Sequence, residues 1–240
     1  MTNIRKLIII PAFNESDSIL ALIDEIKLKA PDFDYIIIDD GSTDNTFELC
    51  MQNSLNAIRL PVNLGIGGAV QTGYLYAKRK GYDIAVQLDG DGQHDPDYLN
   101  ELIAPIIENK ADCTVGGRYI NKQGFQSSKM RQFGIQWLSF FIRLTCGAKV
   151  ADVTSGFRAS NTKVINSFCE YYPHDYPEPE AICFLFKQGF KLKEVAVKMR
   201  ERRVGKSSIR LLRPAYYMLK VTLAILISSL QKQKASKGES

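Results

Sequence analysis

Three carboxylates and an amide are closely spaced near the middle of the chain, in Asp89-Gly90-Asp91-Gly92-Gln93-His94-Asp95. Alternate residues of a locally extended chain share a face, so Asp89 and Asp91 can direct two hard oxygen ligands at one divalent cation, and Gln93 can add a third. The glycines allow a sharp turn and the close approach of a bulky ligand. The stretch predicts a metal and phosphate site; the alternative is a solvated Asp-Gly turn.

Strands and helices that alternate along the chain would position these residues. Short apolar runs predict strands at 6–10, 35–38, 57–60 and 84–88. Helical spacing or helix start signals predict one helix at 17–29, a second that begins near residue 45, and a third that follows the glycines at 65–68 and ends near residue 80. This alternation favours an α/β fold with a mostly parallel sheet flanked by helices. Ligands bind beyond the carboxyl ends of such strands, so the loops at 11–15, 39–44 and 89–95 are expected to share one ligand.

The glycine cluster at 65–68 does not match the pattern of a dinucleotide-binding loop. It follows the third expected strand, and Val70 stands where GxGxxG needs its last glycine. We therefore expect a tight turn into a helix without phosphate contact.

Composition and charge indicate a globular protein with one basic end. The five cysteines form no CxxC pair and no signal-peptide pattern opens the chain, so reduced thiols in a cytosolic compartment are expected. Residues 201–240 hold nine Lys or Arg and two acidic residues, which gives this segment a net charge of +7. Because the net charge of the whole chain is +5, the remainder carries −2. A basic excess at one end favours contact with an anionic surface, and no nucleic-acid-reading motif is present.

Four loop motifs, in order, closely resemble family 2 glycosyltransferases of the GT-A (Rossmann-like) fold. They are Pro11-Ala12-Phe13-Asn14-Glu15, Ile38-Asp39-Asp40-Gly41-Ser42-Thr43-Asp44, Asn63-x-Gly65-x-Gly67 and Asp89-Gly90-Asp91-Gly92-Gln93-His94. Later motifs resemble the polyprenyl-phosphate (dolichyl-phosphate) sugar transferase branch: Gly117-Arg118-Tyr119, Lys129-Met130-Arg131, Asp152 to Arg158, and Glu201-Arg202-x-x-Gly205-x-Ser207. The stretch Tyr176-Pro177-Glu178-Pro179-Glu180 departs from that branch by its prolines.

The resemblance implies a nucleotide-diphosphate sugar as donor, with UDP-glucose or UDP-N-acetylglucosamine expected, and Mg²⁺ or Mn²⁺ as cofactor. Asp89, Asp91 and Gln93 would hold the metal, which neutralises charge on the diphosphate leaving group. Nucleotide contacts are implied for Pro11, Phe13, Glu15, Asp40 and Asp89. A carboxylate such as Asp40 can accept from the imino NH of uracil or guanine; its alternative role is a turn or helix-start acid.

The resemblance also implies an acceptor, a polyprenyl phosphate, near Arg118, Arg131 and Arg202, because guanidinium groups bind phosphate oxygens in pairs. A phosphate is already anionic at neutral pH and needs no strong base, whereas a saccharide hydroxyl needs a carboxylate to take its proton. Asp152, Asp175, Glu178 and Glu180 are candidates for that base or for orienting roles. The catalytic set is expected to be Asp91, Arg131, Asp152 and Glu180.

An inverting transfer to polyprenyl phosphate, for cell-surface polysaccharide or glycan assembly, is thus the expected function. The alternatives are a GT-A enzyme with a saccharide hydroxyl acceptor and a non-catalytic nucleotide-sugar-binding subunit of a membrane complex. His94 could contact the metal or diphosphate, or be a solvated or capping residue. Trp137, on an apolar helical stretch at 135–144, is expected to pack in the core; the alternative is that this helix lines a path for the acceptor.

The last part of the chain predicts membrane contact. Residues 1–208 are expected to form the catalytic domain, and 209–240 a basic, apolar membrane- or partner-associating segment whose helix spans about 214–231. Its uninterrupted apolar part is about half of the ~20 residues that a spanning helix needs. We expect a peripheral or marginally inserted protein at the cytoplasmic face of the cell membrane, with a small membrane subunit or a second copy as a further partner. The alternative for this segment is a helix of the core or of an oligomer interface.

Overall fold

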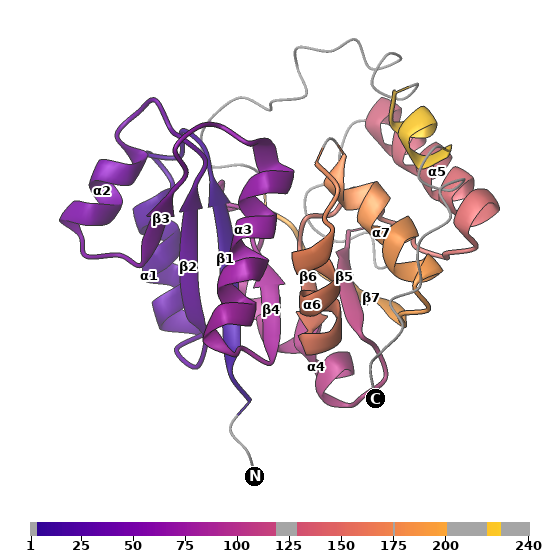
Figure 1. Ribbon diagram of the computed structural model, residues 1–240, viewed down its shortest axis with the longest axis horizontal. Helices are drawn as coiled ribbons and strands as arrows, with labels where there is room; N and C mark the ends of the chain where they lie inside the picture. The colour runs from indigo at the N-terminus through magenta and orange to yellow at the C-terminus, as the bar shows by residue number, and fades with distance from the viewer. Residues whose placement is uncertain (1–3, 119–128, 175, 201–219, 227–240) are drawn as a thin grey trace.

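The computed structural model describes residues 4–118, 129–174, 176–200 and 220–226, and one mixed sheet lies at its centre (Figure 1). The strands are β1 (Lys6–Ala12), β2 (Asp34–Asp39), β3 (Ala57–Arg59), β4 (Ile84–Gln87), β5 (Cys113–Gly117), β6 (Arg158–Asn161) and β7 (Leu192–Ala196). The helices are α1 (Ile19–Lys29), α2 (Thr46–Gln52), α3 (Gly65–Lys80), α4 (Leu99–Ile107) after a short 3₁₀ turn (Pro96–Tyr98), α5 (Lys129–Cys146), α6 (Thr162–Glu170) and α7 (Pro177–Lys187).

The strand order is β3-β2-β1-β4-β6-β5-β7. Strands β3, β2, β1 and β4 run parallel, as the alternating sequence pattern predicts, and β5 pairs parallel with β7. Strand β6 is antiparallel to both of its neighbours. The mostly parallel α/β sheet is therefore confirmed, with an inserted antiparallel strand as the departure from it.

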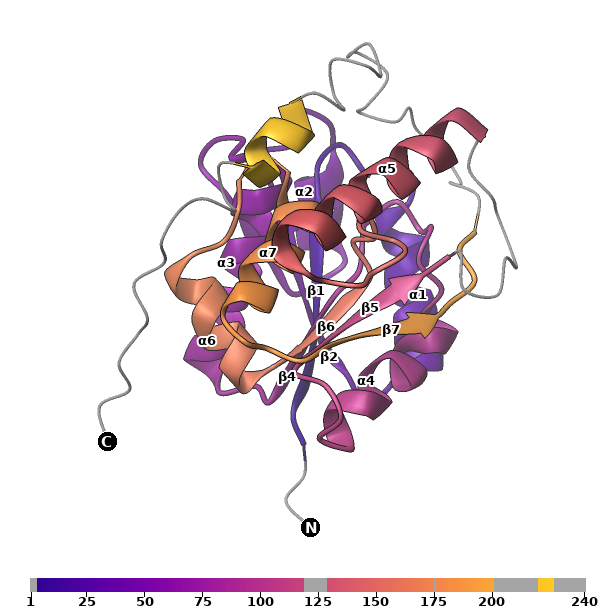
Figure 2. The same ribbon diagram turned by 90° about the vertical axis from the view of Figure 1, so that its right-hand side faces the viewer.

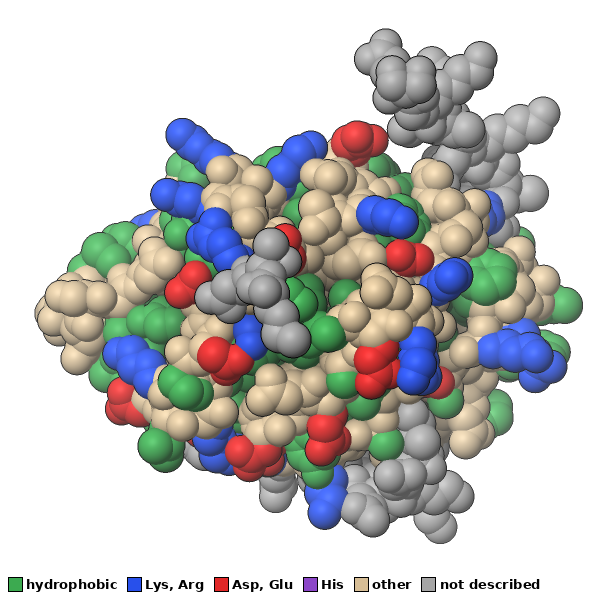
Figure 3. Space-filling model, turned by 90° about the horizontal axis from the view of Figure 1, so that it is seen from below, with side chains coloured by type: hydrophobic (Ala, Val, Ile, Leu, Met, Phe, Trp, Pro, Cys, Tyr) green, Lys and Arg blue, Asp and Glu red, His purple; other side chains and the backbone are tan. Residues whose placement is uncertain are grey.

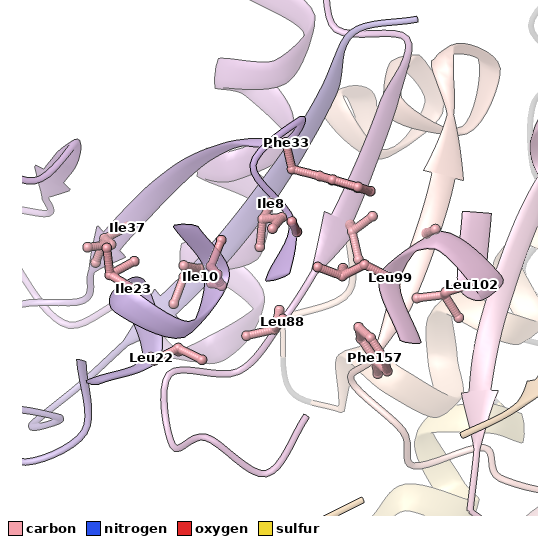
Figure 4. Packing of buried hydrophobic residues seen from close by; sticks show 14 of the residues in the cluster. Ile8, Ile10, Leu22, Ile23, Phe33, Ile37, Leu88, Leu99, Leu102 and Phe157 are labelled. Carbon is pink, nitrogen blue, oxygen red and sulfur yellow. The ribbon is translucent and has the colours of Figure 1, made fainter. Parts of the chain in front are cut away.

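Apolar side chains cover both faces of the sheet because alternate residues of β1 point to opposite sides. Ile8 and Ile10 pack with residues of α1 and α4 on one face, which Figure 4 shows from close by. Leu7 and Ile9 pack with residues of α3, α6 and α7 on the other face. Burial of these alternating residues fixes the register of the strands. In this register the carboxyl ends of β1, β2 and β4 lie at one edge of the sheet.

A third apolar cluster joins α5, α7 and the helical residues 220–226, through side chains that include Leu138, Ile182, Val221 and Ile225. Strand β1 rises from the N-terminus at the bottom of Figures 1 and 2, and α5 and residues 220–226 lie in the upper part of both views. These two helical segments therefore lie at the same end of the molecule as the carboxyl end of β1, but to one side of that strand in Figure 1.

Two sequence predictions need correction in this cluster. Cys146 of α5 and Cys183 of α7 form a disulfide, so reduced thiols are wrong for this pair; Cys50, Cys113 and Cys169 are free. Trp137 is 47 % exposed in α5 and does not pack in the core.

The predicted membrane-associating helix at 214–231 finds little support. Of that range the structure describes 220–226, where Val221 and Ile225 are buried against the protein. Within the described ranges no helix is long and apolar enough to cross a membrane. The expected boundary at 208 lies outside the described residues.

Candidate functional site

Two loops at the carboxyl edge, after β1 and after β2, are joined by hydrogen bonds. The backbone N–H of Asn14 donates to Ser42 Oγ at 3.0 Å, Thr43 N donates to Asn14 Oδ1 at 2.8 Å, and Glu15 N donates to Thr46 Oγ1 at 2.8 Å. Asn14 has a φ of +57°, a left-handed conformation that asparagine tolerates well. The predicted meeting of loops 11–15 and 39–44 is confirmed.

The loop after β4 joins the same edge through Ser18 and Gly90. Ser18 Oγ lies 2.8 Å from Glu15 Oε2 and donates to Gly90 O at 2.9 Å. A Cβ at position 90 would lie 3.2 Å from the Pro11 carbonyl oxygen, so glycine is what allows the loop to approach β1 this closely. Pro11 and Glu15 thus lie beside the acidic loop, and Phe13 is exposed next to them.

Asp40 is buried at the start of α3. Its Oδ1 accepts from Leu64 N at 2.7 Å, and its own N–H donates to Ala12 O at 2.8 Å. Burial raises the pKa of its carboxyl group. Asp40 therefore makes the helix-start contact that was its alternative role. Its neighbour Asp39 is fully buried, its oxygens accept no hydrogen bond from the described residues, and Arg59 Nε at 3.4 Å balances its charge.

The acidic loop presents one exposed and one buried carboxylate. Asp89 has a side chain that is 36 % exposed, whereas Asp91 is buried and its Oδ1 accepts from Gln93 N at 3.0 Å. Gly92 has a φ of +73°, which reverses the chain between Asp91 and Gln93. The described part of the chain contains no group of three His, Cys, Asp or Glu residues that could hold a metal by themselves.

The donor atoms of this loop, two carboxylates and an amide, are nevertheless of the kind that binds a divalent cation. Hard carboxylate and amide oxygens are the ligands that Mg²⁺ and Mn²⁺ prefer. A Cβ at Gly156 would lie 3.0 Å from both oxygens of Asp89, so glycine at this position is what allows the carboxylate to pack this closely against the chain. Gln87 Nε2 approaches Asp89 Oδ1 at 3.4 Å from the end of β4.

The side chain of His94 is hydrogen-bonded to the backbone of the acidic loop. It is buried, its ring stacks on Phe157 with centroids 4.9 Å apart, and its Nδ1 accepts from Asp89 N at 3.0 Å. The proton of the neutral ring is therefore on Nε2, which lies 3.7 Å from Asp89 Oδ2. The solvated alternative for His94 is wrong; the residue holds Asp89 in place.

Arg118 and Asp152 form a buried ion pair after β5. Arg118 Nε and Nη2 donate to the two Asp152 oxygens at 2.6 and 2.8 Å, and Nη2 also donates to Thr154 Oγ1 at 2.9 Å. Asp152 thus orients Arg118, whereas Arg158, considered from the sequence as a partner, donates to backbone carbonyls instead. Arg158 is buried and donates from Nε to Ser155 O at 2.8 Å.

The two glutamates of α7 differ in their surroundings. Glu180 Oε1 accepts from Tyr176 N at 3.2 Å and so caps the first turn of the helix. Burial raises the pKa of Glu178, repulsion from Asp89 raises it further, and Arg158 opposes the shift. Of the other predicted residues, Arg131 lies in the first turn of α5, while Asp175 and Arg202 lie outside the described residues.

One ionic network beside the site was missed from the sequence. Arg200 donates to Glu25 from both Nη1 and Nη2 at 2.8 Å, its Nη2 contacts Asp95 at 2.5 Å, and its backbone N–H donates to Gln93 O at 2.9 Å. Lys29 joins Glu25 at 3.0 Å. Glu25 and Arg200 are 175 residues apart, and no local pattern marks such a pair. The (i, i+4) pair of Glu25 and Lys29 was the one available signal.

Comparisons with known proteins agree with this geometry. The model of glycosyl transferase family 2 matches residues 7–168. A UDP-N-acetylglucosamine--dolichyl-phosphate N-acetylglucosaminyltransferase of Methanococcus voltae is 33 % identical over 211 residues, covering 80 % of this chain and 84 % of that protein. A polyprenol monophosphomannose synthase of Mycolicibacterium smegmatis is 26 % identical, covering 85 % and 81 %.

A similar fold is found in glucosyl-3-phosphoglycerate synthase from Mycobacterium tuberculosis, solved in complex with Mn²⁺, UDP and glucosyl-3-phosphoglycerate. That structure gives a TM-score of 0.70 at 19 % identity and covers 94 % of this chain and 79 % of its own. At this identity the likeness establishes the GT-A type of fold alone. From the match over residues 7–168 and the identity to curated relatives, the chain belongs to glycosyl transferase family 2.

Proposed function

We propose that this chain transfers a sugar from a nucleotide-diphosphate sugar to a polyprenyl phosphate with inversion at the anomeric carbon. The observation behind the proposal is the carboxylate pair Asp89 and Asp91, which follows β4 and lies against the loops after β1 and β2. Relatives named for dolichyl-phosphate, polyprenol and undecaprenyl-phosphate substrates support this acceptor class. UDP-glucose and UDP-N-acetylglucosamine are the proposed donors.

The proposed reaction exchanges one carbon–oxygen bond for another. An oxygen of the lipid phosphate attacks the anomeric carbon, and the bond from that carbon to the β-phosphate oxygen breaks, so that nucleoside diphosphate leaves. The attacking phosphate is anionic at neutral pH, so the exchange needs no proton acceptor. Inversion follows because attack and departure take place on opposite faces of one carbon.

A divalent cation, Mg²⁺ or Mn²⁺, would be held by Asp89, Asp91 and Gln93, and would neutralise charge on the departing diphosphate. The structure of the synthase with Mn²⁺ and UDP supports this choice of ion. Pro11, Phe13, Glu15 and Asp40 are proposed to bind the base and ribose. Burial and the bond from Leu64 N hold Asp40 in one orientation at that edge.

The acceptor phosphate is proposed to bind near Arg118, Arg131 and Arg202. Asp152 is a positioning residue in this proposal, since it fixes the Arg118 guanidinium through two hydrogen bonds. Glu180 would act in the same indirect way by fixing the first turn of α7. The protein would work at the cytoplasmic face of the cell membrane, as a peripheral or marginally inserted protein.

A second candidate is transfer to a saccharide hydroxyl, and Glu178 is the observation that favours it. A carboxyl group whose pKa is raised beside Asp89 has the character of a general base. Glu178→Gln separates the candidates. The variant should keep its activity if the acceptor is a phosphate, and lose at least about 100-fold in kcat if a hydroxyl must be deprotonated.

The proposed function is tested by a donor and acceptor screen. UDP-glucose, UDP-N-acetylglucosamine and GDP-mannose are each incubated with Mg²⁺ or Mn²⁺ and a short-chain polyprenyl phosphate, and nucleoside diphosphate release is measured. We expect release that requires both the metal and the acceptor. A product that keeps the donor's anomeric configuration would contradict inversion, and no turnover with any pair would leave the non-catalytic binding subunit as the better account.

A further inference from the structure

The acidic loop is contacted at its far end by a distant segment of the chain, residues 197–200, which we call the β7 extension. This segment follows β7, the strand at the edge of the sheet. Met199 is buried in the apolar cluster that α1 and α4 share, and its backbone pairs antiparallel with that of His94. The next residue, Arg200, donates its backbone N–H to Gln93 O at 2.9 Å. The β7 extension therefore lies along the acidic loop.

The side chain of Arg200 joins this contact to α1. Its Nη1 and Nη2 donate to Glu25 of α1 at 2.8 Å, and its Nη2 contacts Asp95 at 2.5 Å. Lys29 contacts Asp95 at 3.4 Å and Glu25 at 3.0 Å. Asp95 also accepts from Asp97 N at 3.1 Å and so caps the turn before α4. We call Arg200, Glu25, Lys29 and Asp95 the Arg200 network, and these contacts together fix the end of the acidic loop.

The Arg200 network differs from the ordinary ion pairs of the protein surface. Acidic and basic side chains lie intermixed over the face of the molecule in Figure 3, so an ion pair by itself indicates no function. The pair of Lys110 with Glu108 is of this ordinary kind, with side chains 62 and 52 % exposed. The side chains of Glu25 and Asp95 are only 15 and 17 % exposed. Partial burial, and a guanidinium group that bridges two carboxylates, restrict the network far more than an exposed pair is restricted.

The composition of the acidic loop explains why an external support matters. Gly90 and Gly92 have no Cβ, and glycine loses more conformational freedom on ordering than any other residue. Gln93 is bonded within the loop through its N–H, which donates to Asp91 at 3.0 Å, and to the β7 extension through its carbonyl. A loop that had to become ordered only when a cation binds would bind that cation more weakly.

We propose that Arg200 is a positioning residue for the divalent cation. It would hold the acidic loop ready, through the Gln93 carbonyl and the Asp95 carboxylate, before the ion binds. The inference rests on the proposed function, in which the acidic loop holds the ion, but binding of the ion is measured without turnover. Arg202, which is proposed to bind the acceptor phosphate, is two residues further along the chain. One stretch of chain would thus serve both the cation and the acceptor.

Binding of Mn²⁺ in the presence of UDP is the decisive measurement, and the paramagnetic resonance signal of free Mn²⁺ is its readout. The full chain is titrated at a fixed UDP concentration, with UDP alone as the blank. Arg200→Gln should raise the dissociation constant of Mn²⁺ at least about tenfold, as the loss of outer contacts at metal sites often does. The matched control Arg5→Gln removes an arginine that donates to Lys80 O, and should stay within about twofold.

Two outcomes of this titration would overturn the proposal. One is a dissociation constant that Arg200→Gln leaves unchanged. The other is an equal rise in Arg200→Gln and Arg5→Gln, because a general loosening of the fold would then explain both.

Further variants keep the test decisive if Arg200→Gln does not fold, which urea denaturation would reveal. Arg200→Lys keeps the charge but has no planar fork to bridge two carboxylates, so it should raise the Mn²⁺ dissociation constant about threefold. Glu25→Gln should have a similar effect, and adding it to Arg200→Gln should weaken binding no further, because both changes break one contact. Constants unchanged in Arg200→Lys and Glu25→Gln, or fully additive effects in the double variant, would contradict the proposal.

Hydrogen exchange of the protein without ligands tests the fixation of the loop directly. In Arg200→Gln the amides of residues 89–95 should exchange at least about tenfold faster, whereas those of β1 should keep their rates. Equal exchange of residues 89–95 in the two proteins would overturn the proposal, because a loop that stays ordered without Arg200 does not depend on it.

Activity separates failure of this inference from failure of the proposed function. In the release assay, the loss in Arg200→Gln should be at least about fivefold greater at low Mn²⁺ than at saturating Mn²⁺, since excess ion offsets the cost of ordering the loop. Mn²⁺ binding that depends on Arg200, without turnover on any acceptor, would overturn the proposed function alone. Normal turnover with Mn²⁺ binding independent of Arg200 would overturn the positioning role alone, and no Mn²⁺ binding by the unmodified protein would overturn both.

Discussion

The N-terminal half of the molecule, from β1 to β4, differs from the C-terminal half, from β5 to residue 226, in what positions the site residues. In the first half, hydrogen bonds to neighbouring segments place Glu15 and Asp40, and a hydrogen bond within its own loop places Asp89. Each of these loops follows a buried parallel strand. In the second half, contacts between distant segments place Arg118 and α5, through a buried ion pair, an apolar cluster and a disulfide.

If the proposed function is correct, the difference teaches that the two proposed substrates place different demands on the chain. A nucleotide sugar is small and polar, so recognition needs a rigid, hydrogen-bonded edge. A lipid phosphate brings a bilayer with it, so the second half needs an outer surface as well as a binding site. Exposed apolar residues on α5 are consistent with that second demand.

The largest effect is expected from a substitution in the carboxylate pair of the N-terminal half. Asp91→Ala should lower kcat for nucleoside diphosphate release by about 10³-fold or more, because the diphosphate loses a ligand of its cation. Asp97→Asn, an exposed acid a few residues further on, is the matched control and should stay within about twofold. An Asp91→Ala variant with normal release would contradict the assigned role of the loop.

The second effect breaks the C-terminal half at its ion pair. Asp152→Ala leaves the Arg118 guanidinium buried without its carboxylate, and should lower the free energy of unfolding by about 3 kcal/mol or more in urea denaturation. Glu108→Ala removes one partner of the exposed Lys110 pair and should leave the urea midpoint unchanged. A similar small change in both variants would show that the Arg118 pair is solvated.

The third prediction probes the contact between the halves through Glu25. Hydrogen bonding to Arg200 lowers the pKa of Glu25 to about 2, against an ordinary value of 4.5. The folded state therefore holds fewer protons, and the stabilisation is complete above about pH 4.5 and lost as the pH falls towards 2. Between pH 5 and 2 the unmodified protein should lose about 2 kcal/mol more than Glu25→Gln.

Urea denaturation of both proteins at both pH values measures this difference. Parallel pH profiles for Glu25→Gln and the unmodified protein would mean that Arg200 does not pair with Glu25 in solution.

The smallest effect is expected from a substitution of Gly156, which lies against the carboxylate of Asp89. Gly156→Ala adds a Cβ at 3.0 Å from both carboxylate oxygens, so the side chain of Asp89 must move. We expect the apparent Mn²⁺ affinity in the release assay to fall about tenfold, as outer-shell changes at metal sites often cause. The urea midpoint should stay the same. Unchanged metal dependence would place the cation away from Asp89.

The sequence predicted the N-terminal half of the molecule better than the C-terminal half. The expected strands at 6–10, 35–38, 57–60 and 84–88 correspond to β1 to β4, because each is a local apolar run that a polar loop ends. Glycine at 65 begins α3 with a φ of +78°, in agreement with the expected turn into a helix.

The C-terminal half was less predictable because its contacts are long-range. Arg118 and Asp152 are 34 residues apart, and β6 enters the sheet antiparallel between β4 and β5, which no spacing rule foretells. The pairing of Cys146 with Cys183 depends on how α5 packs on α7. Trp137 was misjudged because apolar periodicity alone does not distinguish a buried face from an exposed one.

The most direct test of the account compares two acceptors that differ only in the phosphate group. The unmodified protein is given its best donor, Mn²⁺ and either a short-chain polyprenyl phosphate or the matching free polyprenol, and the sugar-carrying lipid is quantified. We predict product from the phosphate and none from the alcohol, with normal product from Glu178→Gln. Transfer to the polyprenol, or to a saccharide hydroxyl with loss in Glu178→Gln, would contradict the claim that a lipid phosphate is the nucleophile.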